Sequence, residues 1–111
     1  MNVKTIQIIV SGRVQGVGLR ACVRRIALDM NINGTVMNLP DGRVQVVAVG
    51  ESIILEKFLS MLYGCPRALI RDIQVIEINF QQFEGFFIIK GGGEDQYNTL
   101  NISRFLRDSD I

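Results

Sequence analysis

Residues 11–20 separate two segments of different hydrophobic period, and this change of period restricts the folds open to the chain. Before it, the β-branched run 5–10 places Ile6, Ile8 and Val10 on one face, which predicts a strand. After it, apolar residues recur at helical spacing, at Leu19, Val23, Ile26, Ala27 and Met30. The segment between contains three glycines, which accept backbone conformations that other residues resist. The sequence therefore predicts a strand, a glycine-rich turn and a helix in succession.

The chain continues this alternation up to residue 90. Further strands are predicted at 35–39, at 43–49, within 68–80 and at 86–90, and a second amphipathic helix at 52–63. The turn Pro40-Asp41-Gly42 joins the first two of these strands, which predicts an antiparallel hairpin. Gly50 is expected to end the strand and Gly64 to end the second helix. The order βαββαβ with an added final strand predicts an α+β two-layer sandwich, an antiparallel sheet with two helices on one face.

The length of 111 residues suits one domain, which we assign to residues 1–90. Gly91-Gly92-Gly93 breaks the pattern, and residues 91–111 are predicted to form a polar C-terminal tail, either flexible or docked as a short helix. No apolar run approaches membrane-spanning length and no signal segment is recognisable. We therefore predict a cytoplasmic protein without membrane contact and favour a monomer.

Composition narrows the function classes. The net charge of +1 argues against a surface that binds nucleic acid. RNA-recognition motifs share this order of elements, but the aromatic platform on which they stack bases is not evident on the predicted central strands. The sequence contains no histidine, so general base catalysis by imidazole and histidine metal sites are excluded.

Cys22 and Cys65 are the only cysteines, too few for a cysteine-rich zinc site. They could pair with each other, but the sequence does not place their Cα atoms within disulfide range. We predict two reduced, partly buried thiols and keep a disulfide as the alternative.

The glycine-rich segment has the chemistry of a site for a small oxyanion. Successive backbone N–H groups in such a turn can converge on one point, and the following helix presents its unpaired N–H groups at the same place. Arg20 adds a fixed charge and a planar fork of donors suited to phosphate. The spacing matches neither G-x-G-x-x-G nor a Walker loop, so the glycines alone leave an ordinary strand-to-helix turn as the alternative.

Residues 12–20, Gly-Arg-Val-Gln-Gly-Val-Gly-Leu-Arg, closely resemble the acylphosphatase signature G-x-V-Q-G-V-x-[FY]-R. A second motif of that family, G-x-V-x-N followed by D-G, is similar to residues 34–38 and to Asp41-Gly42. The two motifs occur in the order and separation typical of the family, and the resemblance covers about residues 3–90. Residues 17–20 and 63–66 also look like the acylphosphatase-like domain that begins hydrogenase-maturation carbamoyltransferases.

This resemblance implies a ferredoxin-like fold and hydrolysis of the carboxyl–phosphate bond of small acyl phosphates, without metal or cofactor. It also implies that Arg20 binds phosphate and that Asn38 positions the attacking water. The implied phosphate-binding residues, acting through backbone N–H groups and the Arg20 side chain, are Gln15, Gly16, Val17, Gly18, Leu19 and Arg20. A domain that binds carbamoyl phosphate or another acyl phosphate with little or no turnover is the alternative.

Residues of the motifs also have structural interpretations. Arg20 could be a solvated arginine, although a first helical turn disfavours a cation unless an anion lies nearby. Asn38 could simply cap the hairpin turn. Gln15 is expected to brace the loop by hydrogen bonds, and Leu19 to fill a core position where the family has an aromatic residue. Thr35 stands where many members carry an aromatic residue, so we expect it near the site, with an effect on acyl-group preference.

Overall fold

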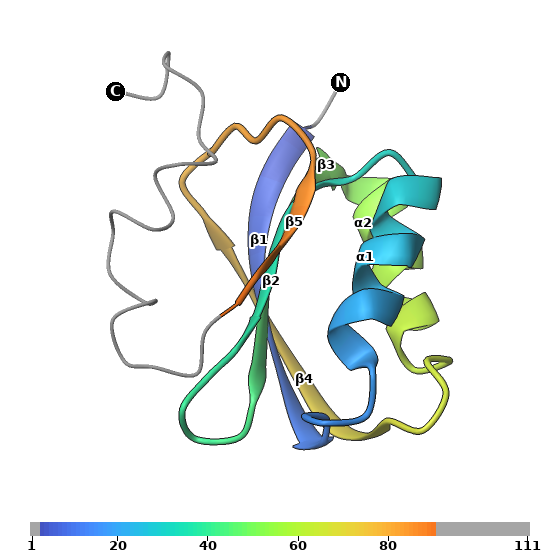
Figure 1. The fold of residues 1–111 in the computed structure, drawn as a ribbon. Coiled ribbons are helices and arrows are strands. Elements are labelled where there is room, and N and C mark those ends of the chain that lie inside the picture. The colour runs from blue at the N-terminus through green and yellow to red at the C-terminus, as the bar shows by residue number, and fades with distance from the viewer. Residues whose placement is uncertain (1–2, 91–111) are drawn as a thin grey trace.

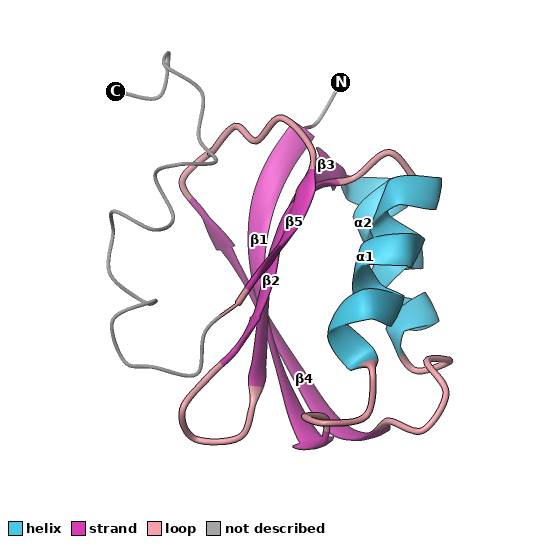
Figure 2. Cartoon of the chain, viewed as in Figure 1, coloured by secondary structure: helices cyan, strands magenta, loops and turns pink. Residues whose placement is uncertain are grey.

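The computed structural model of the protein describes residues 3–90. They form two layers, a five-stranded sheet and two helices that lie against one of its faces (Figure 1). In chain order the elements are β1 (Val3–Arg13), α1 (Leu19–Asp29), β2 (Asn33–Asn38), β3 (Val44–Glu51), α2 (Ser52–Leu62), β4 (Leu69–Ile78) and β5 (Phe86–Ile89). The predicted α+β sandwich is confirmed, and Figure 2 shows the two helices together on one side of the strands. The tail predicted over residues 91–111 lies outside the described residues.

The sheet has the strand order β4-β1-β3-β2-β5 and is mixed rather than wholly antiparallel. β2 and β3 form the predicted hairpin, and β1 pairs antiparallel with both β3 and β4. β2 therefore runs in the same direction as β1. The chain reverses again after β4, so β5 also runs with β1 and pairs in parallel with β2, where Val36 lies opposite Ile88. Residues 79–85 make the connection from one edge of the sheet to the other (Figure 1).

The core lies between the sheet and the helices, as the apolar stripes predict. On β1, the alternate residues Ile6, Ile8 and Val10 are buried. The buried helix residues from the predicted stripes are Leu19, Val23, Ile26, Ala27, Leu55, Phe58 and Leu62. Each large apolar side chain buried in this way stabilises the fold by roughly 2 kcal/mol relative to an exposed one.

The expected strand end at Gly50 is wrong. β3 continues to Glu51, which is also the N-cap residue of α2. Gly50 pairs with Lys4 as an ordinary strand residue and does not adopt the left-handed conformation that would turn the chain. The first helix ends just before Asn31, which has φ 57°, and Ile32 N donates to Ala27 O at 2.8 Å.

The prediction of two reduced thiols is also wrong, because Cys22 and Cys65 form a disulfide. Their Cα atoms lie 6.0 Å apart across a sequence separation of 43 residues. Cys22 lies on α1, and Cys65 lies in the loop after α2, beyond Tyr63 and Gly64. The two helices pack side by side on one face of the sheet, which brings these distant positions together (Figure 1). Local periodicity carries no information about that proximity.

Replacing both cysteines, Cys22→Ala with Cys65→Ala, is expected to lower the free energy of unfolding by about 3 kcal/mol, because the bridge restricts the unfolded chain. Urea unfolding with and without a reducing agent measures the effect. The reducing agent should lower the unfolding midpoint of the wild type and leave that of the double variant unchanged. If full reduction left the unfolding midpoint of the wild type unchanged, the bridge would not be stabilising.

Within residues 3–90, neither helix has the length and apolar composition needed to cross a membrane.

Candidate active site

The glycine turn leaves β1 and enters α1 at one end of the molecule. Gly16 and Gly18 have φ values of 73° and 78°, which side chains rarely allow. Gly18 is the N-cap residue of α1 and supplies no side-chain cap. Among residues 3–90, the backbone N–H groups of residues 15–20 donate no hydrogen bond to another backbone group. The turn therefore has donors available for a ligand, as the oxyanion prediction requires.

Gly12, the first glycine of the motif, does not belong to this turn. It lies within β1, at the register shift between β1 and β4. A Cβ at this position would overlap Leu69 O and lie 2.8 Å from Arg71 N. Glycine at position 12 therefore allows β1 and β4 to approach closely, whereas Gly16 and Gly18 shape the turn.

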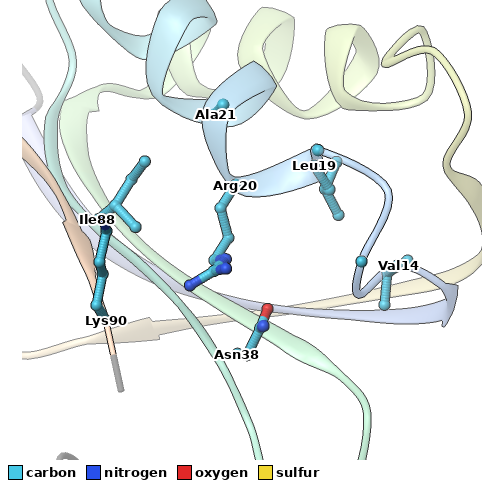
Figure 3. A pocket seen from close by; sticks show the side chains of 9 residues that line it. Val14, Leu19, Arg20, Ala21, Asn38, Ile88 and Lys90 are labelled. Carbon is cyan, nitrogen blue, oxygen red and sulfur yellow. The ribbon is translucent and has the colours of Figure 1, made fainter. Parts of the chain in front are cut away.

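Arg20 and Asn38 face each other across a pocket of about 180 Å³ (Figure 3). The half-buried Arg20 side chain extends from the first turn of α1, and Asn38 is the last residue of β2. The lining residues are Val14, Gly16, Gly18, Leu19, Arg20, Ala21, Asn38, Ile88 and Lys90. Residues from the two motifs, far apart in sequence, thus meet at one pocket.

Gln15 and Val17 are not lining residues of this pocket. The Gln15 side chain donates from Nε2 to Leu39 O at 2.8 Å and to Arg43 O at 2.9 Å. These bonds tie the glycine turn to the hairpin that carries Asn38, which agrees with the predicted bracing role. Leu19 is buried in the core, as expected for a residue that supports the turn from behind.

The hairpin turn after Asn38 is closed by its own hydrogen bonds. Arg43 donates to the Asp41 carboxylate from its backbone N at 3.0 Å and from Nε at 2.8 Å. The side-chain bond and the backbone bond from Arg43 hold the pKa of the Asp41 carboxyl below its usual value. Leu39 N donates to Arg43 O at 2.8 Å, and Gly42 has φ 97°. Asp41 and Gly42 therefore act as turn residues, and they lie outside the lining of the pocket.

The motifs did not identify Ile88 and Lys90, which line the pocket from the end of β5 (Figure 3). β5 pairs with β2, and Arg24 Nε donates to Phe86 O at 2.9 Å, so α1 also holds this strand. The charged end of the predicted strand 86–90 was visible in the sequence, but its position beside β2 was not. Lys90 adds a second cation to the pocket that holds Arg20, and none of the lining residues in the described part of the chain carries a carboxylate.

Thr35 does not lie where it was expected. It is buried, but it is absent from the lining of the pocket. Side chains alternate between the two faces of a strand. Val36 belongs to the core beneath the helices, so Thr35 points to the opposite face, where it pairs with Val47. The expected effect of Thr35 on acyl-group preference has no support in this geometry.

The pocket combines backbone N–H groups, two cationic side chains and one neutral amide, which suits a tetrahedral oxyanion. Among residues 3–90, no group of three or more Cys, Asp and Glu side chains is placed to hold a metal ion.

Comparisons with known proteins identify similar sequences and folds. The family model described as Acylphosphatase matches residues 6–89. An acylphosphatase of Archaeoglobus fulgidus is 48% identical over 82 residues, which cover 73% of this chain and 92% of that protein.

Two solved structures show the same similarity at the level of the fold. The crystal structure of acylphosphatase from Bacillus subtilis superposes with a TM-score of 0.75 at 34% identity, covering 79% of this chain and 99% of that one. The crystal structure of HypF from T. kodakarensis gives a TM-score of 0.69 at 41% identity, covering 79% of this chain and 12% of that one.

Proposed function

The chain belongs to the acylphosphatase family, and from this we propose that it hydrolyses the carboxyl–phosphate bond of small acyl phosphates at the pocket between Arg20 and Asn38. One observation carries the assignment of the site. The Arg20 guanidinium, at the start of α1 beside the Gly16–Gly18 turn, points across the pocket toward the Asn38 amide (Figure 3).

In the proposed complex, the phosphoryl group lies at the start of α1. The backbone N–H groups of residues 15–19 bind its equatorial oxygens, and their dipoles and the helix dipole favour its negative charge. Arg20 binds the same oxygens through its planar fork of donors. Charge that develops on these oxygens in the transition state meets donors already in place, so Arg20 also stabilises the transition state.

Asn38 orients the attacking water in this scheme, because its amide offers both an acceptor and donors. The water oxygen forms a bond to phosphorus as the bond from phosphorus to the carboxyl oxygen breaks. The carboxylate leaves with the electron pair, and the protons of the water pass to phosphate and solvent. A carboxylate is a good leaving group, so positioning and electrostatic stabilisation suffice and the site needs no strong acid.

Purified protein is expected to hydrolyse benzoyl phosphate to equal amounts of benzoate and inorganic phosphate, with full activity after exhaustive chelation. Chelation should have no effect, because none of the described residues that line the pocket supplies a carboxylate, thiolate or imidazole to hold a divalent ion. Spectrophotometric assay against the spontaneous rate measures the reaction.

Two outcomes would contradict parts of this proposal. Activity that is lost on chelation and restored by a divalent ion would overturn the metal-independent mechanism. Saturable phosphate binding without turnover would instead favour the alternative, a domain that only binds acyl phosphates.

A further inference from the structure

We propose that Arg25 and Arg67 form a second anion site beside the catalytic pocket. It would take the terminal carboxylate or phosphate of an acyl phosphate whose phosphoryl group lies between Arg20 and Asn38. The inference rests on the proposed function, since it names the class of acyl group that the enzyme prefers.

The site is a pocket of about 190 Å³ along the first two turns of α1. Its lining includes Gly18 and Ala21, which also line the catalytic pocket. The two pockets are therefore neighbours across Gly18 and Ala21. The acyl chain of a bound substrate that extends from the phosphoryl group across Gly18 and Ala21 would enter the second pocket.

The charges in this pocket are of one sign. Among the described residues that line it, Arg25 and Arg67 are the only charged ones. Within residues 3–90, Arg43 forms an ion pair with Asp41. Neither Arg25 nor Arg67 forms an ion pair with a carboxylate of these residues, so their charges are not neutralised by them. Paired guanidinium groups recognise carboxylates and phosphates through charge-assisted hydrogen bonds.

Arg67 occupies a backbone conformation that arginine does not prefer. Its φ of 69° lies in the left-handed region, where the Cβ atom is strained. Its Nη2 atom lies 3.4 Å from the position that a Cβ would take at Gly18. The Arg67 side chain therefore reaches Gly18, on the rim between the two pockets.

The disulfide holds both arginine-bearing segments in place. Cys22 lies on α1 between Ala21 and Arg25, and Cys65 precedes Arg67 by two residues. The bridge thus fixes the loop of Arg67 against the helix of Arg25. A site held in this way loses less conformational entropy when it binds a ligand.

The test compares acyl phosphates of equal chain length that differ in a terminal carboxylate: succinyl against butyryl phosphate, and glutaryl against valeryl phosphate. We expect the wild type to show a higher kcat/KM for the dicarboxylic member of each pair. Arg67→Gly and Arg25→Ala should each reduce this preference roughly fivefold to tenfold, because a charge-assisted hydrogen bond is lost at an exposed site. Arg67→Lys should keep part of the preference.

The controls separate a binding role from a folding role. Glycine accepts φ 69° without strain, so Arg67→Gly should keep or raise the free energy of unfolding while it loses the preference. Arg71 is an exposed arginine on β4 that lines neither pocket, so Arg71→Ala should leave the preference unchanged. Turnover of butyryl phosphate should be similar in all of these variants.

The outcomes distinguish this inference from the proposed function. Hydrolysis of butyryl phosphate with no preference for the dicarboxylic substrate, or with a preference that the variants do not change, would overturn the second site and leave the proposed function intact. If free succinate alters butyryl phosphate turnover in an Arg67-dependent way without any substrate preference, the site serves a separate anion and the substrate assignment is wrong. Failure to hydrolyse any acyl phosphate would overturn the proposed function itself.

Discussion

Arg20→Ala is expected to lower kcat/KM for benzoyl phosphate by on the order of 10³-fold, because it removes phosphate binding and transition-state stabilisation together. The backbone N–H groups of the turn stay in place, so the loss is less than complete. Arg20→Lys should recover only part of the activity, since an ammonium keeps the charge but not the planar fork. Steady-state kinetics on the three proteins measures these differences.

Phosphate binding provides an independent readout of Arg20. The folded protein has the convergent donors and the unfolded chain does not, so phosphate should raise the unfolding midpoint of the wild type in a saturable way. In the Arg20→Ala variant, the saturable rise of the unfolding midpoint with phosphate should be smaller. Arg13 belongs to the same motif but is exposed at the end of β1, so Arg13→Ala serves as the matched control. An identical response to phosphate in all three proteins would show that the turn is no anion site.

Asn38→Ala is expected to lower kcat by roughly 10²-fold and to leave phosphate affinity near that of the wild type, because the role proposed for Asn38 is to orient the water rather than to bind the phosphoryl group. Asn38→Ala should therefore lose turnover alone, whereas Arg20→Ala should lose both turnover and phosphate affinity. Kinetics with inorganic phosphate as a competitive inhibitor gives both quantities in one experiment.

Asn33, at the opposite end of β2, offers a matched control for Asn38, since it is exposed and does not line the pocket between Arg20 and Asn38. Asn33→Ala should keep wild-type turnover. An Asn38→Ala variant with full activity would show that Asn38 only closes the hairpin turn.

Local sequence sufficed for the elements and for naming candidate residues that meet at one pocket. The strand, glycine turn and helix from Val3 to Asp29 follow from hydrophobic periods that depend on near neighbours in the chain. Arg20 and Asn38 were identified through motifs, in which residue identity and spacing are preserved along short segments. The sequence also indicated the bracing role of Gln15, although not its partners, the carbonyls of Leu39 and Arg43.

The remaining features depend on contacts between segments that are distant in the chain. The Cys22–Cys65 bridge exists because two helices share one face of the sheet. Lys90 lines the pocket between Arg20 and Asn38 because β5 pairs with β2. Thr35 does not line it, because strand alternation turns its side chain to the other face. Arg67 reaches Gly18 only through the anchored loop after α2. A periodic pattern shows which face of an element is apolar, but it does not show what lies against that face. Packing of the whole chain decides this, so the sequence by itself determined the elements and the chemistry of the two motifs, and the tertiary structure determined what surrounds them.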